Sequence, residues 1–342
     1  MQTRLPLRMA GCAQCFAAAL CGRCPFPDCT HCAHADCLER TCPVAGQRAE
    51  ASEVVEWLEA IGDLELPRAA ACDTRGLEVP RFIPVVKPQE RGTRLPTYPC
   101  YAITLASIMT PSARALYPGA RTIRRDLGLP KGAALALLLW EKDEYLENLW
   151  ARRTRARLIE GLVGLGADLV VAPNYSVYGD EPRMAHLINI KRSLVIATEL
   201  ADAGARVVPH IYWWSRTDVA RWAAWLRENV EVGWVAINWQ TVRADASSWQ
   251  TLCDGLGALI AAVGREDLGI LIGGVTRPGR LSQLAHLLRG RPWAFTNHHV
   301  HVVACKRLAY DRSGGAVPFP DKSYAWCLER NIHFFSQLPG RL

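Results

Sequence analysis

The residues with the clearest chemical pattern are eight cysteines near the start of the chain, which include three consecutive C-x2-C pairs. A C-x2-C turn places two thiolates on the same side of the backbone, and two such turns complete a tetrahedral four-cysteine site. Eight thiolates in this spacing therefore predict two metal ions. The predicted ligands are Cys12, Cys15, Cys21, Cys24, Cys29, Cys32, Cys37 and Cys42.

Three identities for this segment stay open. Two structural zinc ions, with His31 or His34 able to replace a cysteine, suit the spacing. Iron–sulfur clusters are the alternative cofactor, because Cys24 and Cys42 each precede a proline as in ferredoxin cluster loops, although the ferredoxin spacing is missing. A disulfide framework is the third, and nothing else in the sequence suggests secretion. A metal would offset the ordering entropy of so short a segment, roughly 1–2 kcal/mol per residue.

A second group of candidate residues follows apolar runs in the rest of the chain. Reactive groups of α/β proteins lie just past the carboxyl ends of parallel strands, so the polar residues there are the candidates. The predicted general acids or bases are Glu141, Asp143 and Asp180. The predicted ligand-binding residues, which would stack on a planar ring or hydrogen-bond to its edge, are Asn174, Ser176, Tyr178, His210, Trp213 and Asn238. The competing interpretation is structural, because such residues also cap barrels and begin helices.

The elements that must position these residues alternate regularly. Apolar runs with helical patterns between most of them predict a parallel sheet with helical crossovers. The runs cover 101–106, 133–140, 168–174, 206–213, 233–239, 268–274 and 292–298, with 331–337 as a candidate eighth strand. We expect the α/β class, as a (β/α)8-like barrel of the TIM type that is complete or lacks a strand. A doubly wound open sheet is the alternative, although no dinucleotide or P-loop glycine motif follows any run.

The chain divides into three parts by composition. Residues 1–48 form the Cys-rich metal-binding module, and residues 49–99 hold a short helix over 51–64 and an extended stretch rich in proline, arginine and glycine. Residues 100–342 form the barrel-like domain with a basic C-terminal region. The longest predicted helices cover 145–165, 183–203, 217–230, 247–263 and 279–288.

The composition limits the class of protein. With 342 residues, 50% hydrophobic and 21% charged, the chain is neither disordered nor fibrous, and its core needs no disulfides. From Thr276 onward the chain has ten basic and three acidic residues, and this excess of seven positive charges equals the net charge of the whole chain, +7. If the basic residues share one surface, they predict a polyanionic partner. A solvated arginine-rich surface is the alternative. No uninterrupted apolar stretch reaches the length of a membrane span, and we expect a cytoplasmic protein.

A histidine cluster suggests a separate hypothesis. If residues 298–301 continue a strand, His299 and His301 point to one face, in a pattern similar to the metal-dependent nicking endonucleases of rolling-circle replication. Tyr310 or Tyr324 would then be the nucleophile. Against this hypothesis, the surrounding α/β pattern is not that fold, and no third metal ligand is evident. An exposed histidine-rich strand is the alternative.

The strand-end motifs, taken together, resemble an uncharacterised family of bacteria, phages and integrative elements called domain of unknown function 4417. The similarity covers roughly residues 100–275, and its most specific part is the pattern P-D-[FY]-S-x-Y-x-D-x-P. The residues that match this pattern are Tyr175, Ser176, Tyr178, Asp180 and Pro182. Asn174 stands where the family has aspartate, and an amide cannot transfer a proton. The resemblance implies an association with mobile elements or phages and leaves the reaction open.

Three hypotheses of function follow. The first is a metal-containing protein that engages nucleic acid through its Cys-rich module and basic C-terminal region, with a barrel that modifies or senses a nucleotide or base. The second is a small-molecule enzyme whose N-terminal centre is an iron–sulfur cluster. The third is a non-catalytic assembly subunit in which a zinc module docks protein partners. The visible spectrum and metal content of the protein separate the second from the others.

Overall fold

The computed structural model describes residues 59–338, apart from 63, 90–91, 115, 178–182 and 241–245. The chain forms two compact units, Met1–Pro67 with Tyr175–Val195 and Arg68–Asn174 with Ile196–Leu342. The predicted metal ligands between Cys12 and Cys42, together with Tyr178 and Asp180, lie outside the described residues. Within the part that the structure describes, no helix is both long and apolar enough to cross a membrane.

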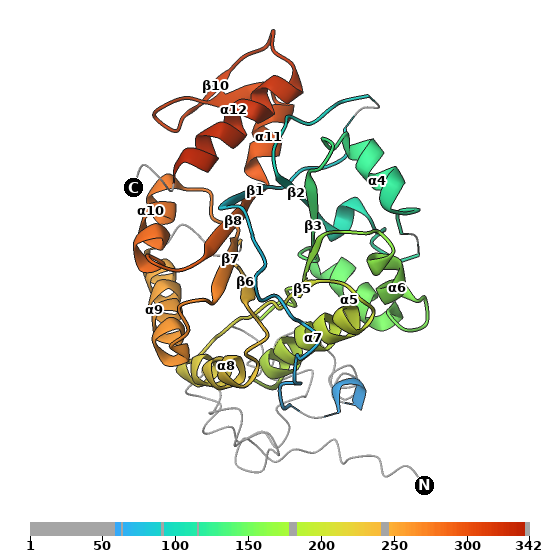
Figure 1. The fold of residues 1–342 in the computed structure, drawn as a ribbon, viewed down its shortest axis with the longest axis vertical. Coiled ribbons are helices and arrows are strands. Elements are labelled where there is room, and N and C mark those ends of the chain that lie inside the picture. The colour runs from blue at the N-terminus through green and yellow to red at the C-terminus, as the bar shows by residue number, and fades with distance from the viewer. Residues whose placement is uncertain are drawn as a thin grey trace, which may run out of the picture. The chain divides into compact units, whose positions relative to one another are not determined.

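Eight short strands of the second unit form parallel sheets (Figure 1). They are β1 (Phe82–Pro84), β2 (Cys100–Thr104), β3 (Ala134–Leu138), β4 (Leu169–Val171), β5 (Val207–Val208), β6 (Trp234–Asn238), β7 (Gly269–Gly273) and β8 (Trp293–Asn297). One sheet has the order β1-β8-β7-β6 and the other β2-β3-β4-β5. Parallel bridges between Val85 and Ala102 and between His210 and Ala236 join the two sheets at both edges. The strands therefore follow one another in a closed ring, and the α/β class with parallel sheets is confirmed.

Helices connect the strands, and those within 120–163 and 216–287 lie outside the ring (Figure 1). The helices over 183–202, 216–228, 246–263 and 278–287 agree closely with the predicted ones, and the helix over 120–127 was not predicted. The expected helix over 145–165 is two helices. The chain between them contains Arg157 in the left-handed region, with φ of 51°, which interrupts the helix. The helices are α4 (Ala120–Leu127), α5 (Asp143–Arg152), α6 (Leu158–Val163), α7 (Arg183–Asp202), α8 (Arg216–Glu228), α9 (Ala246–Val263) and α10 (Pro278–Leu287), and a 3-10 turn, η2, covers Leu105–Ser107.

The eighth strand is not where the sequence predicted it. Residues 331–337 belong to α12 (Tyr324–Gln337), which begins after an N-cap where the Ser323 side chain accepts a hydrogen bond from Trp326 N. The eighth strand is instead β1, which lies in the proline-rich stretch and pairs with β8 through Phe82–Phe295 and Ile83–Thr296. Three residues among prolines give too short a pattern for sequence analysis to separate from an extended linker.

The last part of the second unit follows the ring. It consists of α11 (His299–Cys305), the antiparallel pair β9 (Leu308–Tyr310) and β10 (Ala316–Pro318), and α12. Buried Asn331 of α12 joins these elements, because its side chain accepts from Tyr310 N and donates to the carbonyls of Val300 and Leu308. The expected histidine strand at 298–301 is therefore wrong. His299 begins a helix, and the strand geometry required by the nicking-endonuclease hypothesis is absent.

The core of the second unit lies inside the ring. Alternate residues of each strand face inward, as the two-residue period of a strand requires. Cys100 and Ala102 of β2 and Ala136 and Leu138 of β3 pack there with Leu271 of β7, all buried. Gly273 and Gly269 of β7 leave room for the indole rings of the larger members of this cluster, Trp140 and Trp234.

Candidate functional site

Polar side chains converge at the end of the ring where the parallel strands have their carboxyl ends. Glu141 follows β3, and its side chain accepts a hydrogen bond from Thr104 Oγ1 of β2 at 3.1 Å. The backbone N–H of Glu141 donates to Asn174 Oδ1 beyond β4 at 3.3 Å, and Lys142 N donates to Glu141 Oε1 at 3.2 Å. Thr104 and Lys142 thus hold the Glu141 carboxyl group, and Asn174 holds its backbone.

His298, directly after β8, lies in the field of this carboxyl group. Burial lowers the pKa of His298, the charge of Lys87 lowers it further, and Glu141 raises it in part. The imidazole is therefore neutral near pH 7. Its Nε2 atom is buried and has no hydrogen-bond partner among the described residues. Since buried polar atoms of native proteins are nearly always paired, an atom of this kind points to a ligand or water at the site.

Two further rings lie beside Glu141 and His298. The ring of His301 stacks on that of His298 with centroids 5.4 Å apart, and its Nδ1 is 2.8 Å from the Tyr324 hydroxyl. Burial lowers the pKa of His301 to about 4. Trp140, which precedes Glu141, fits against Gly273 of β7, where any Cβ would collide with the indole ring. Trp140 Nε1 is a second buried polar atom without a partner in the described part of the chain.

His210 and Asn238, both predicted to bind a ligand, hold the ends of β5 and β6 together. His210 Nε2 accepts a hydrogen bond from Asn238 N at 3.3 Å, and Asn238 Oδ1 accepts one from Gln240 N at 3.0 Å. Burial lowers the pKa of His210 to about 3, so the ring stays neutral and proton transfer near neutral pH is excluded for it. The acceptor atoms that would recognise a ligand are thus already bonded to the backbone.

Trp213 was expected to stack on a planar ligand, and the structure places it in the core instead. Its exposed fraction is 6%, and its ring meets that of Trp239 edge to face with centroids 6.4 Å apart. The indole also fits against Gly255 of α9, where a Cβ would collide with Nε1. β5 ends at Val208, so Trp213 lies beyond the strand, where its indole packs against α9.

The remaining predicted site residues have different positions. Asp143 is the first residue of α5, where a carboxylate stabilises the helix N-terminus. Ser176 belongs to the first unit, where its carbonyl accepts a hydrogen bond from Asn189 Nδ2 at 2.7 Å. In the same unit the Arg192 guanidinium lies 4.1 Å from the centre of the Tyr175 ring.

Four residues of this site were not among the predicted site residues: Lys87, Thr104, Trp140 and His298. Thr104 and His298 satisfy the strand-end rule that selected Glu141, so the same rule could have found them. Lys87 could not be found because β1 was not recognised as a strand. Trp140 packs in the core inside the ring with Ala136 and Leu138 of β3. The sequence does not show which residues of β3 face inward, so it could not select Trp140.

No group of three or more His, Cys, Asp or Glu side chains that could hold a metal ion occurs in the described residues. The eight predicted cysteine ligands lie outside them, and the metal module stays a prediction. The other cysteines at 72, 100, 253, 305 and 327 are free thiols.

Comparisons with known proteins add little to this geometry. No protein-family model matches the chain, and no curated protein matches it. Among solved structures the chain is similar to a mutant GH128 (subgroup I) endo-β-1,3-glucanase from Amycolatopsis mediterranei in complex with laminaripentaose. The identity is 14%, the match covers 51% of this chain and 75% of that one, and the TM-score is 0.29. The resemblance to domain of unknown function 4417 stays a prediction.

Proposed function

We propose that the ring of strands is a (β/α)8 barrel of the TIM type and that its carboxyl end is a catalytic site for acid–base chemistry. The observation that carries this proposal is the convergence on Glu141. Its carboxyl group is held by Thr104 and lies in range of His298, whose buried Nε2 has no partner among the described residues. In barrels of this type the strand ends supply the reacting groups.

Glu141 and His298 would have different roles in the reaction. Glu141 would move the proton, because a carboxyl group fixed by neighbouring hydrogen bonds can accept a proton from a bound molecule and return it. His298, kept neutral by burial, would hold a substrate atom through Nε2. The indole N–H of Trp140 would supply a further donor. These groups form a small set of polar atoms above an apolar core, the usual composition of a small-molecule site.

The substrate class that we propose is a nucleotide or a nucleobase, which the barrel modifies or senses. Such a ring carries both donors and acceptors on its edge, and the site offers a carboxyl group, an imidazole and an indole N–H. With Trp213 buried in the core, the stacking role proposed for it is lost. Tyr178 keeps that role as a prediction, since it lies outside the described residues.

The proposal is tested by comparing two glutamates. The wild-type protein is incubated with nucleobases, nucleosides, nucleotides and short oligonucleotides, and products are detected by liquid chromatography and mass spectrometry. Glu141→Gln should abolish any conversion, because the amide keeps the shape of the side chain and cannot transfer the proton. Glu144→Gln, on the exposed face of α5, should leave conversion unchanged. Equal activity of wild-type and Glu141→Gln proteins would refute the proposal.

We further propose that the protein is a cytoplasmic, metal-containing member of a phage or mobile-element system that associates with nucleic acid. The excess of basic residues after Thr276 supports nucleic-acid binding, and the spacing of the eight cysteines supports two zinc ions. The protein is purified without oxygen, and its metal content and visible spectrum are measured. Bound zinc with no visible absorption would support two zinc ions, whereas a brown protein would support the iron–sulfur alternative. In a binding assay the affinity for DNA should fall steeply with salt, by a slope of about 0.9 per phosphate neutralised.

If Glu141→Gln changes nothing and the zinc is present, the third hypothesis, a non-catalytic subunit that docks partners through the Cys-rich module, is the one that stands. Asn174 is compatible with it, because the matching family position is an aspartate and the amide here serves only as the acceptor for Glu141 N.

A further inference from the structure

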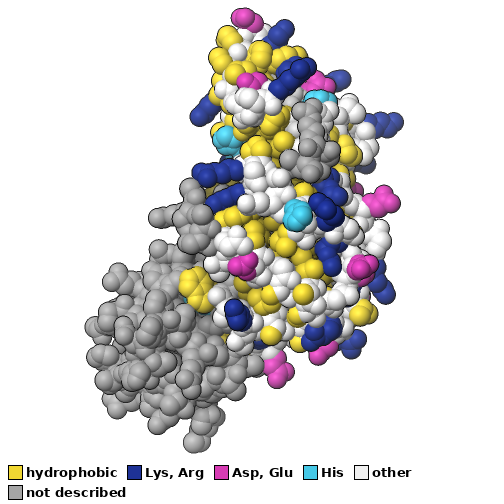
Figure 2. Space-filling model, turned by 90° about the vertical axis from the view of Figure 1, so that its left-hand side faces the viewer, with side chains coloured by type: hydrophobic (Ala, Val, Ile, Leu, Met, Phe, Trp, Pro, Cys, Tyr) yellow, Lys and Arg dark blue, Asp and Glu magenta, His cyan; other side chains and the backbone are white. Residues whose placement is uncertain are grey.

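The basic residues of the C-terminal region do not form one surface. Lys306, Arg307, Arg312, Lys322 and Arg330 lie on or beside β9, β10 and α12, where three acidic residues oppose them. The four arginines of residues 276–305 lie on or beside α10, and that stretch contains no acidic residue. Figure 2 shows the side of the molecule that carries α9 and α10, with Lys and Arg side chains beside apolar surface. The unopposed charge is therefore concentrated next to α10.

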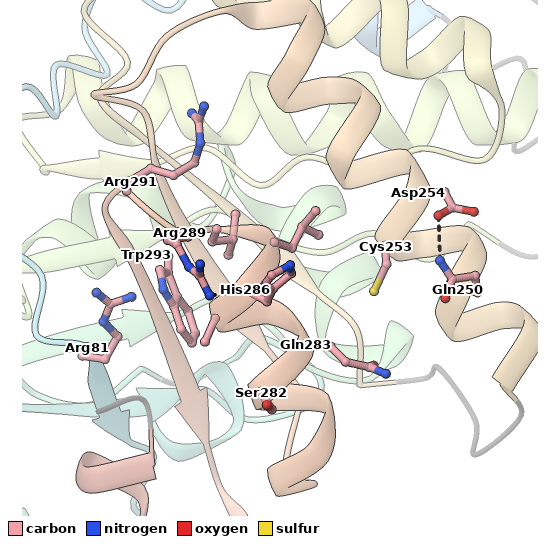
Figure 3. Close-up of a pocket in the computed structure, with 14 residues that line it drawn as sticks. Arg81, Gln250, Cys253, Asp254, Ser282, Gln283, His286, Arg289, Arg291 and Trp293 are labelled. Atoms are coloured by element: carbon pink, nitrogen blue, oxygen red, sulfur yellow. Dashed lines mark hydrogen bonds between the residues drawn. The ribbon is translucent and has the colours of Figure 1, made fainter. Parts of the chain in front are cut away.

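A cavity of about 720 Å³ lies on this side, between α9, α10 and the segment that leads into β8. Its volume is within the range of about 300–1,000 Å³ that is typical of ligand sites. Figure 3 shows Arg289 and His286 next to each other in the cavity. Trp293 and Arg81 lie on one side of them, and Cys253 of α9 lies on the other. Arg81 and Trp293 stand at the amino ends of β1 and β8, so this cavity is separate from the Glu141 site.

The charges in the cavity are unbalanced. Arg81, Arg289 and Arg291 line it, and Asp254 is the only acidic residue among the lining side chains. Asp254 Oδ1 already accepts a hydrogen bond from Gln250 Nε2 at 2.7 Å. None of the three arginines forms an ion pair with a described carboxylate. A cavity with three cations and one engaged anion attracts an anionic ligand.

Each of the three arginines has a partner within the protein, but these contacts do not use all of its N–H donors. Arg289 Nη2 donates to His286 Nδ1 at 3.2 Å, which places the proton of a neutral His286 ring on Nε2 and makes that atom a donor. Arg291 Nη1 donates to the Arg265 carbonyl at 2.6 Å. The Arg81 guanidinium lies 4.5 Å from the centre of the Trp293 ring, and burial alone lowers its pKa. A partly buried guanidinium without an acidic partner is a site for an incoming anion.

The geometry also indicates which part of a ligand is bound. Trp293 is 4% exposed and covered by Arg81, so it cannot stack on a base. Planar guanidinium groups match the oxygens of a phosphate, to which they donate two parallel hydrogen bonds. We infer that the cavity between α9 and α10 binds phosphate groups. This inference deepens the proposed association with nucleic acid, and it is independent of the chemistry proposed for Glu141.

The test compares two charge reversals in the full chain. Inorganic pyrophosphate is titrated by calorimetry, and a short single-stranded oligothymidylate is titrated by fluorescence anisotropy. Arg289→Glu should weaken binding by about tenfold or more, because it replaces a charge-assisted donor with a repelling anion. Arg289→Gln should give a smaller loss. Arg121→Glu, an exposed reversal on α4 outside the cavity, is the matched control and should change affinity by less than about twofold.

The two probes separate the sources of phosphate. If pyrophosphate binds and Arg289→Glu weakens it selectively, the cavity takes a discrete phosphorylated ligand. If only the oligonucleotide shows this selective loss, the cavity takes the backbone of nucleic acid. Absence of saturable binding of either probe, or equal losses in the Arg289→Glu and Arg121→Glu variants, would overturn the inference. Since Glu141→Gln is read out by product formation, a failure of either proposal is recognised without the other.

Discussion

The carboxyl ends of β5 and β6 and those of β2, β3 and β8 carry similar kinds of side chain but hold them differently. On the β5–β6 side, His210 and Asn238 bond to backbone N–H groups and Trp213 packs against α9. On the β2–β3–β8 side, Glu141 is held by one side-chain donor, and His298 Nε2 has no partner in the described residues. In the first set the acceptor atoms of His210 and Asn238 are bonded within the protein, and Trp213 Nε1 is buried against α9 without a partner in the described residues. The second leaves polar atoms for a ligand.

This difference shows what makes a strand-end residue a candidate for chemistry. Position at the carboxyl end is shared by both sets, so position alone does not decide. The deciding property is whether the hydrogen-bonding capacity of the side chain is already used. A buried atom without a partner costs about 1–3 kcal/mol, and a protein retains such an atom where a bound molecule completes it.

The comparison predicts the largest loss of stability at Trp213. Trp213→Ala removes a buried indole that fills the space between Trp239 and Gly255, and it should lower the free energy of unfolding by about 3–5 kcal/mol. Urea unfolding followed by far-UV circular dichroism measures the loss. The matched truncation His298→Ala should cost about 1 kcal/mol or less, because its ring is only partly buried. Equal losses in the two variants would contradict the distinction between the two sides.

The burial of His210 makes the stability of the protein depend on pH. The pKa of His210 is about 6.5 in the unfolded chain and about 3 in the folded protein, because burial excludes the charged form. Between these values the unfolded state binds a proton that the folded state does not. The free energy of unfolding therefore falls as pH falls, by up to about 1.4 kcal/mol per pH unit for one proton.

His210→Gln should remove that contribution. The variant should lose less stability than the wild type between neutral and acidic pH, as measured by urea unfolding at a series of pH values. His301, whose pKa is also lowered, keeps its own contribution in both proteins, so the slope decreases without vanishing. His333→Gln, at an exposed position on α12, is the control and should leave the slope as in the wild type. An unchanged slope in His210→Gln would show that this ring is hydrated.

Much of the fold follows from sequence because local pattern and tertiary structure agree. Seven strands and the helices from α7 to α10 lie where hydrophobic periodicity predicts them. The eighth strand was missed because Phe82–Pro84 gives only three residues of pattern, and its pairing with β8 involves residues more than two hundred positions away. Whether a short extended segment becomes a strand depends on such pairing between distant residues, which local sequence patterns do not show.

The candidate site was predicted less completely, for a related reason. Glu141 was selected by its place after an apolar run, and in the structure it accepts a hydrogen bond from Thr104. Trp213 was selected by the same rule and proved to face the helices. To tell a residue such as Glu141 from one such as Trp213, one must know where each strand ends. β5 ends at Val208, five residues before the end of the run predicted over 206–213. Nothing in the sequence marks that end.

A residue just past the β5 end has a purely structural role. Ser215 is the N-cap of α8, where its side chain accepts from Asp218 N and Asp218 in turn accepts from Ser215 N. Such a capping box satisfies two free N–H groups of the helix. Ser215→Ala should lower stability by about 1 kcal/mol and Tm by about 2–4 °C, measured by thermal denaturation. Ser215→Thr should retain most of the stability, and a loss as large as that of alanine would rule out capping.

The smallest effect on stability, and the most informative about the site, is expected at Thr104. Thr104→Val keeps the shape of the side chain and removes the hydroxyl that donates to Glu141 Oε2. Because both partners are only partly buried, the free energy of unfolding should fall by about 1 kcal/mol or less. Any reaction that depends on Glu141 should slow by up to about tenfold, since the carboxyl group loses a contact that orients it.

Thr104→Ser, which keeps the hydroxyl, should recover most of the rate. If Thr104→Val instead lowers stability strongly and leaves the reaction unchanged, Thr104 belongs with His210 and Asn238, as a residue that joins strand ends. The β2–β3–β8 side would then be satisfied within the protein in the same way as the β5–β6 side, and the catalytic proposal would lose the contrast on which it is built.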